Sequence, residues 1–329
     1  MIPSPPPILL GLLGALLASL VGGTVTRVIA LRNADDTLRR KRLASLRSWW
    51  IISLLLAAGL LAGRLGVCLL FAAASIIALR EYADILGIRD SERPALVVAQ
   101  VIAVAAYLLI LLDQPAAFVV GVPVGALAIL AVLQVIRGRT AGYIRTTGGL
   151  FFGVMVLVYG LAHAAYLFVH PASASGPAGP AGWLLFLLVL TESNDIFQAL
   201  VGRSIGAHKR HRIAPTVSPN KTWEGFLGGL VTTLILAWLI APWLTTLDVV
   251  PGPLAVTEAA RGWVGPLAAG TVIAVAGLFG DLNMSGIKRD GGAKHSGTLL
   301  PGMGGLIDRV DSLSFTAPAF VYLLAWWMR

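Results

Sequence analysis

Long apolar runs separated by short polar segments make up most of this chain. A helix needs about 20 apolar residues to cross the hydrocarbon core of a membrane. Ten runs approach or reach this length, and they lie at 8–28, 49–63, 66–81, 95–112, 116–136, 148–169, 183–202, 225–245, 263–281 and 312–328. The pattern therefore predicts an all-α polytopic integral membrane protein with about ten transmembrane helices.

The segment 49–81 allows two interpretations. Gly63 and Arg64 interrupt it, and they form either a tight turn between two short spans or a kink in one long helix. We divide the chain into N-terminal transmembrane helices, 1–182, with about six spans, and a C-terminal transmembrane region, 183–329, which carries the candidate catalytic residues. No sequence repeat relates the two parts, and we expect them to form one integrated membrane domain.

Composition excludes an ordinary soluble protein. Of the 329 residues, 57% are hydrophobic and 12% are charged, whereas a soluble domain is about 45–50% apolar and about 25% charged. The net charge of +9 could indicate a nucleic-acid partner, but the placement of the cations indicates another cause. Cys68 is the only cysteine of the chain, so no internal disulfide can form.

The lysines and arginines gather in alternate connections between the apolar runs. If the N-terminus lies outside, the inner connections are 29–48, 82–94, 137–147, 203–224 and 282–311, and they hold most of the cations. This distribution obeys the positive-inside rule. We therefore predict cytoplasmic loops at a bacterial-type cell (inner) membrane and no nucleic-acid partner. The RRKR cluster at 39–42 is expected to contact anionic headgroups of membrane lipids.

The last inner connection has the highest density of residues that can carry chemistry. Its charged residues, including those at its two edges, are Asp281, Lys288, Arg289, Asp290, Lys294, Asp308, Arg309 and Asp311. Glycines among them let the backbone approach phosphates, cations bind phosphates, and carboxylates bind hard cations such as Mg²⁺. Two acids brought together by a returning loop would repel unless a divalent cation lay between them. The stretch predicts a phosphate-handling, Mg²⁺-assisted site at the membrane surface, with Asp281 and Asp308 as the metal ligands.

A second candidate element is SPNKTWEG at 218–225. Ser218, Lys221 and Thr222 can present donors to an anion, Pro219 is expected to fix a turn, and Glu224 is expected where the next helix begins. A helix start adds the favourable dipole for an anion. The alternative is a capped helix start with no ligand, and the sequence leaves both interpretations open.

A third element lies within an apolar span. Glu192, Asn194 and Asp195 interrupt LLFLLVL…IFQALVG, and Glu192 and Asp195 share one helical face because they are three residues apart. A carboxylate at membrane depth costs several kcal/mol unless it is paired, protonated or bound to a metal. We favour a functional role over simple helix packing, and Asp195 is a candidate metal ligand.

Taken in order, these elements resemble those of the phosphatidate cytidylyltransferases, or CDP-diacylglycerol synthases. The family's C-terminal signature has the elements S-x-x-K-R, K-D, P-G-H-G-G and D-R-x-D. The matching residues here are Ser285, Lys288, Arg289, Lys294, Pro301 to Gly305 and Asp308 to Asp311. The SPxKTWEG element and the pair Asn194 and Asp195 also look like elements of the family, so the resemblance covers roughly 190–312.

The resemblance implies transfer of a cytidylyl group from CTP to phosphatidic acid, or a related lipid phosphate, with Mg²⁺ as cofactor. Asp281, Asp308, Lys288 and Arg309 would be catalytic, with Arg309 stabilising the departing pyrophosphate. Asp281 and Asp308 would hold the metal, with Asp195 as a further ligand. Substrates would bind at Ser218, Lys221, Thr222, Glu224, Ser285, Arg289, Lys294 and Asp311.

Two residues depart from the family pattern. His295 stands where the family usually has Asp, and Met303 replaces the histidine of the glycine turn. The alternatives are a cytidylyltransferase for another lipid phosphate, a CTP-dependent lipid kinase and a non-catalytic lipid-binding paralogue. A transporter with Glu192 and Asp195 as ion ligands fits less well, since no inverted repeat is present. A homodimer is left open.

Overall fold

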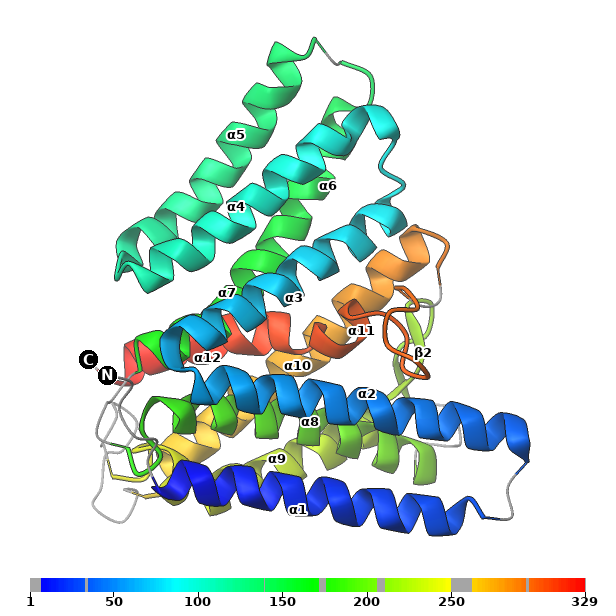
Figure 1. Cartoon of the computed structure of the whole chain (residues 1–329), viewed down its shortest axis with the longest axis vertical. Coiled ribbons are helices and arrows are strands. Elements are labelled where there is room, and N and C mark those ends of the chain that lie inside the picture. The colour runs from blue at the N-terminus through cyan, green and yellow to red at the C-terminus, as the bar shows by residue number, and fades with distance from the viewer. Residues whose placement is uncertain are drawn as a thin grey trace.

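The computed structural model describes residues 7–32, 35–138, 140–171, 176–205, 211–249, 262–293 and 296–328. Helices dominate this part of the chain, with one short antiparallel hairpin (Figure 1). In chain order the elements are α1 (Pro7–Ala30), α2 (Asp36–Leu61), α3 (Gly63–Leu86), η1 (Asp90–Glu92), α4 (Arg93–Leu111), η2 (Ala117–Gly121), α5 (Val122–Ile136), α6 (Tyr143–Gly153), η3 (Val154–Gly160), α7 (Leu161–Val169), α8 (Gly179–Ser204), β1 (Arg212–Ala214), β2 (Ser218–Thr222), α9 (Trp223–Leu244), α10 (Val264–Asp290), α11 (Ile307–Val310) and α12 (Leu313–Trp327).

The all-α membrane architecture is confirmed. Nine helices of the described residues are long and apolar enough to cross a membrane. The tenth predicted span is present as α12, which has 15 residues. Because a helix rises 1.5 Å per residue, α12 alone is shorter than a hydrocarbon core of about 30 Å. It packs against α7 and α10. The protein is therefore an integral membrane protein.

The segment 49–81 forms two helices joined by a tight turn. Gly63 lies in this turn with φ of 71°, a left-handed conformation that glycine adopts without strain. The helices α2 and α3 then pack against each other at glycines, since a Cβ on Gly66 would lie 2.6 Å from the Gly59 carbonyl oxygen. The interpretation as two spans joined by a tight turn is confirmed, although the two spans, 20 and 24 residues long, are longer than expected.

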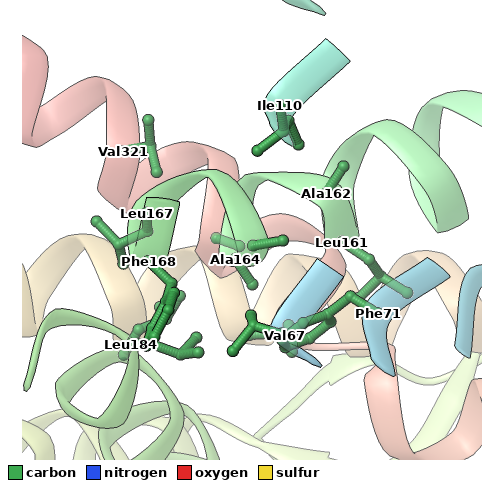
Figure 2. Packing of buried hydrophobic residues seen from close by; sticks show 14 of the residues in the cluster. Val67, Phe71, Ile110, Leu161, Ala162, Ala164, Leu167, Phe168, Leu184 and Val321 are labelled. Atoms are coloured by element: carbon green, nitrogen blue, oxygen red, sulfur yellow. The ribbon is translucent and has the colours of Figure 1, made fainter. Parts of the chain in front are cut away.

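The buried core lies around the continuous helical segment α6, η3 and α7. Figure 2 shows Leu161, Ala164 and Leu167 of α7 packed among apolar side chains from neighbouring helices. These neighbours include Val67 of α3 and Leu184 of α8. From this central position α7 contacts α3 and α4 of the N-terminal part and also α8 and α12.

Several predicted boundaries were wrong at the polar ends of the helices. The helix expected from residue 49 begins at Asp36, and the helix expected to end at Asp281 continues to Asp290. The hydropathy pattern marks only where a helix leaves the apolar layer, while its backbone hydrogen bonds continue through the polar residues that follow. As a consequence Asp281, Ser285 and Lys288 lie along one face of α10 rather than in a loop.

The connection before α9 also differs from the expectation. Residues 218–222 form strand β2, which pairs antiparallel with β1. Pro219 therefore lies in a strand, and the turn of the hairpin is formed by residues 215–217. Figure 1 shows β2 and α11 at the same end of the helix bundle. We call this end, which also carries the C-terminal end of α10, the site end.

Candidate functional site

Lys221 of β2 joins two transmembrane helices at the site end. Its Nζ lies 2.7 Å from Asp281 Oδ2 on α10 and donates a hydrogen bond of 3.0 Å to Gln198 Oε1 on α8. Ser285 Oγ donates to the other Asp281 oxygen at 3.4 Å. The lysine is thus held in one position by groups from α8 and α10, which is the arrangement expected of a fixed point charge.

The start of α9 is positioned by a side-chain cap and by glycines. Thr222 Oγ1 accepts a hydrogen bond of 3.1 Å from the Gly225 backbone N–H, so α9 begins with a side-chain cap, which is compatible with both interpretations of this element. A Cβ on Gly229 would lie 2.9 Å from Asn194 Oδ1, and this close approach sets α9 directly on α8. Glu224 pairs with His211 at the surface.

Lys288 and Asp308 form a second ion pair. Lys288 Nζ lies 2.7 Å from Asp308 Oδ1, and the other carboxylate oxygen accepts from the backbone N–H groups of Ser296 and Gly305 at 3.4 Å each. Burial acts to raise the pKa of Asp308, but the Lys288 hydrogen bond and charge and these N–H groups outweigh it and hold that pKa below its ordinary value. Asp308 is therefore ionised at neutral pH and fixes the loop that precedes α11.

Three carboxylates from different segments concentrate negative charge nearby. Burial raises the pKa of Asp311 well above its ordinary value, and the charges of Asp281 and Asp195 raise it further. A Cβ on Gly280 would lie 2.6 Å from the Asp311 carbonyl oxygen, so glycine lets α10 approach the start of α12 this closely. One oxygen of Asp195 is buried without a hydrogen-bond partner among the described residues. Lys221, Lys288 and Arg309 act electrostatically on these acids, and Lys221 is in direct contact with Asp281.

The sequence predicts that Asp281 and Asp308 hold a metal together. In the structure each of them lies against a different lysine. Asp281 is paired with Lys221 and Asp308 with Lys288, while Asp281 is the neighbouring charge with the largest effect on Asp311. The spacing along the chain could not reveal this, because α10 continues past Asp281 and sets the direction of its side chain.

The remaining predicted residues lie around these groups. Arg309 acts electrostatically on Asp195, and its Nε is buried without a hydrogen-bond partner in the described part of the chain. Arg289 Nε donates to the Val217 carbonyl oxygen at 3.4 Å, which joins α10 to the hairpin. Lys294 and His295 lie outside the described residues.

A pocket of about 550 Å³ opens beside Lys221. The lining residues that bear on its chemistry are Gln198, Arg203, Arg212, Ser218, Lys221 and Asp281. Arg203 and Arg212 were not selected from the sequence, where they read as ordinary positive-inside residues. Arg212 Nε and Gln198 Nε2 are buried donors without a partner among the described residues. The pocket therefore offers cationic and neutral donors to a polyanion.

Comparison with known proteins supplies the class of this site. The model of the cytidylyltransferase family matches residues 43–327, a range that includes all the groups described above. The chain belongs to the cytidylyltransferase family. It is accordingly a nucleotidyltransferase enzyme, and family membership implies CTP and a lipid phosphate as the substrates.

Individual relatives cover different shares of this cytidylyltransferase. The uncharacterized protein YnbB of Escherichia coli (strain K12) is 38% identical over 279 residues, which are 85% of this chain and 86% of YnbB. A phosphatidate cytidylyltransferase of Brucella abortus is 35% identical over 216 residues, 66% of this chain and 68% of the relative. A phosphatidate cytidylyltransferase of Chlamydia trachomatis is 36% identical over 162 residues, 49% of this chain and 48% of the relative.

The acids of this cytidylyltransferase fit a hard divalent cation. Oxygen donors of Asp195, Asp281 and Asp311 are the ligand type that Mg²⁺ prefers, and the buried Asp195 oxygen without a partner is free for one. No three His, Cys, Asp or Glu side chains in the described ranges are grouped so as to hold a metal by themselves. The fit is therefore to a cation that shares its ligands with substrate phosphates and water, as Mg²⁺ usually does.

Glu81 of α3 was not among the residues selected from the sequence. This residue is buried, and its carboxylate accepts backbone hydrogen bonds from Leu306 and Ile307, which lie next to Asp308. The available signal was a carboxylate within the last turns of an apolar run, the same signal that drew attention to Glu192. It was overlooked because Glu81 lies at the end of the run, where an acid can reach water.

Proposed function

We propose that this enzyme transfers the cytidylyl group of CTP to phosphatidic acid, forming CDP-diacylglycerol and pyrophosphate. The observation that carries the proposal is the meeting of Asp195, Asp281 and Asp311 with Lys221 and Lys288 at one end of the bundle. Carboxylates for a metal and cations for phosphates are the parts that phosphoryl chemistry requires. Relatives named phosphatidate cytidylyltransferase support this lipid as the acceptor.

The chemistry requires positioning more than activation of a nucleophile. A lipid phosphate is already an anion, so it can attack the α-phosphorus of CTP without a strong general base. The enzyme has to bring two polyanions together and stabilise the charge that develops as pyrophosphate leaves. Lys221 and Lys288 suit this task because each is held by an aspartate and has little freedom to lose on binding.

We assign the residues to roles on this basis. Lys221, Lys288 and Arg289 would bind phosphate oxygens, Ser218 and Ser285 would orient them, and Arg309 would stabilise the departing pyrophosphate. Asp195, Asp281 and Asp311 would hold Mg²⁺, and Asp308 remains a candidate ligand from the sequence pattern. When bound, the metal supplies charge that neutralises phosphate oxygens in the transition state.

The location of the site supports a cytoplasmic reaction. Arg203, Arg212, Lys221 and Arg289 all lie in or beside connections that the positive-inside rule places on the cytoplasmic side. CTP is a cytoplasmic metabolite, while the acyl chains of the lipid stay in the bilayer. We propose a bacterial-type inner membrane as the location.

The direct test uses purified protein in detergent–lipid micelles with phosphatidic acid, Mg²⁺ and CTP labelled in cytosine. We expect label to enter the lipid fraction with release of pyrophosphate, and EDTA to stop the reaction. Release of CDP instead of pyrophosphate would show a lipid kinase and contradict the proposal. Absence of both products despite CTP binding would exclude phosphatidic acid as the acceptor.

A cytidylyltransferase for another lipid phosphate is the second candidate. The observation in its favour is that similarity to the uncharacterized YnbB extends over 85% of this chain, compared with 66% for the Brucella abortus enzyme. The departure at Met303 falls in the glycine turn of the family signature and agrees with a changed acceptor. The same assay with an isoprenoid phosphate in place of phosphatidic acid separates the two candidates.

Arg212 provides a test of the pocket beside Lys221. We expect Arg212→Ala to raise the KM for CTP about tenfold, because a charge-assisted contact to a phosphate contributes about 1.5–3 kcal/mol. The kcat should change much less, since the contact is present before and during the reaction. Arg93→Ala is the matched control: Arg93 is a highly exposed arginine of another inner connection and pairs only with Asp90 in the described structure. An unchanged KM in Arg212→Ala would exclude the pocket as the nucleotide site.

A further inference from the structure

Glu81 connects the N-terminal helices to the loop that precedes α11. Its Oε1 accepts a hydrogen bond of 2.9 Å from the Leu306 N–H, and its Oε2 accepts one of 3.0 Å from the Ile307 N–H. Glu81 lies on α3, some 225 residues earlier in the chain, and is 9% exposed. A buried carboxylate that accepts two consecutive backbone N–H groups fixes both the position and the direction of that backbone.

The loop is shaped around this carboxylate. A Cβ on Gly297 would lie 3.0 Å from Glu81 Oε1, and a Cβ on Gly305 would lie 2.4 Å from Oε2. Gly297 and Gly305 lie near the two ends of the loop, and the absence of a side chain at each lets the loop pack closely against Glu81. Ser48 of α2 adds a second link, since its Oγ donates to the Pro301 carbonyl oxygen at 3.0 Å.

The segment held in this way leads directly into the candidate site. Asp308 follows Ile307 in the chain, and its carboxylate accepts from the backbone N–H of Gly305, which precedes Leu306. Arg309 and Asp311 follow in the same short stretch. The backbone that Glu81 fixes therefore also determines the positions from which their side chains extend. A displacement here would move Asp308, Arg309 and Asp311 together.

From these contacts we propose that Glu81 is a positioning residue for catalysis. It holds the backbone at residues 306–307 so that Asp308, Arg309 and Asp311 meet the groups of α8 and α10. The N-terminal helices thereby contribute to the site without contacting substrate. We call the contact between Glu81 and the backbone at residues 306–307 the clamp. The effect of the clamp on catalysis rests on the proposed cytidylyl transfer, whereas the clamp itself does not.

Glutamine at position 81 is the informative substitution because it preserves size while removing half of the acceptor function. A glutamine has one carbonyl oxygen and one NH₂ group, and the NH₂ would face a backbone N–H, so only one of the two bonds can form. A misplacement of about 1 Å at a reacting group can cost about 100-fold in rate. We expect Glu81→Gln to lower kcat about 10- to 100-fold while the KM for CTP changes less than about threefold.

Glu92 offers a matched control at the same end of the bundle. It is 7% exposed and also accepts from a backbone N–H, that of Arg89 at 2.8 Å, and from the Thr146 hydroxyl. Its contacts join η1 to α6 and do not involve the loop before α11. Glu92→Gln should lower thermal stability to a similar extent as Glu81→Gln but leave kcat within about twofold of the unmodified protein, since no group of the site depends on it.

Hydrogen exchange tests the clamp independently of the reaction. In full-length protein in nanodiscs, Glu81→Gln should speed exchange at the amides of Leu306 and Ile307, and Glu92→Gln should not. Unchanged exchange in Glu81→Gln would overturn the clamp, and a kcat loss shared equally by the Glu92 variant would reduce Glu81 to a stabilising residue. If the unmodified protein transfers no cytidylyl group but the exchange result holds, the proposed function fails while the clamp stands.

Discussion

Replacing Asp311 with asparagine is expected to abolish cytidylyl transfer and at the same time to stabilise the protein. Asp311 is buried near Asp281 and Asp195, whose charges oppose its own. Asparagine has almost the same shape but removes a carboxyl group whose ionisation is opposed by burial and by these neighbouring charges. Active sites commonly retain such unfavourable clusters because the cluster binds a cation or substrate, at a cost in stability.

The loss of transfer and the gain in stability should both be measurable. Transfer should fall by more than about 100-fold, as when an electrostatic group of an active site is removed. Removal of a buried carboxyl group that its surroundings disfavour should raise the melting temperature in the absence of metal by about 2–4 °C, which corresponds to about 1 kcal/mol. Added Mg²⁺ should stabilise the unmodified protein more than the variant, since a ligand stabilises only the form that binds it. Activity assays and thermal unfolding with and without Mg²⁺ measure these effects.

Asp290→Asn is the control for this experiment. Asp290 is an exposed acid at the C-terminal end of α10, outside the three-acid group. We expect its replacement to leave transfer and the Mg²⁺ effect unchanged. If Asp311→Asn keeps full activity, or loses stability as a simple packing residue would, the assignment of the three acids as a cation site is wrong.

Breaking the pair of Lys288 and Asp308 should have the second large effect. Both side chains are mostly buried, with 13% and 9% of their surface exposed. Removal of one partner of a buried pair leaves the other charge uncompensated and costs about 3–5 kcal/mol. We therefore expect Lys288→Met to destabilise the protein strongly and to lower transfer by at least about 100-fold.

The double variant separates stability from catalysis. Asp308→Asn combined with Lys288→Met removes both charges, so much of the lost stability should return, while transfer should remain absent. A double-mutant cycle on melting temperature and kcat makes this comparison. Recovery of activity together with stability would mean that the pair serves only the fold. Full activity in Asp308→Asn alone would exclude Asp308 as a metal ligand and as a catalytic residue.

Most of the candidate residues could be identified from the sequence because charged side chains are rare next to membrane-spanning segments. Charged groups beside apolar spans are costly unless they have a function, so Asp195, Asp281 and Lys221 could be selected without any structure. Other residues around the site could not be selected in this way. Arg212 had an adequate explanation as a positive-inside residue, and Glu81 lies far from the C-terminal motifs along the chain.

The sequence by itself determined the class of fold, the number of apolar helices and the segments in which the site would be found. Hydrophobic burial in lipid and the positive-inside rule depend on residue type along the chain, which a sequence shows directly. Only the tertiary structure decided which acid faces which cation: Asp281 with Lys221, and Asp308 with Lys288. These pairings depend on how far α10 continues beyond the apolar layer and on the close approach of helices at glycines such as Gly229 and Gly280. Such contacts join residues distant in the chain, and the periodicity of a single helix does not encode them.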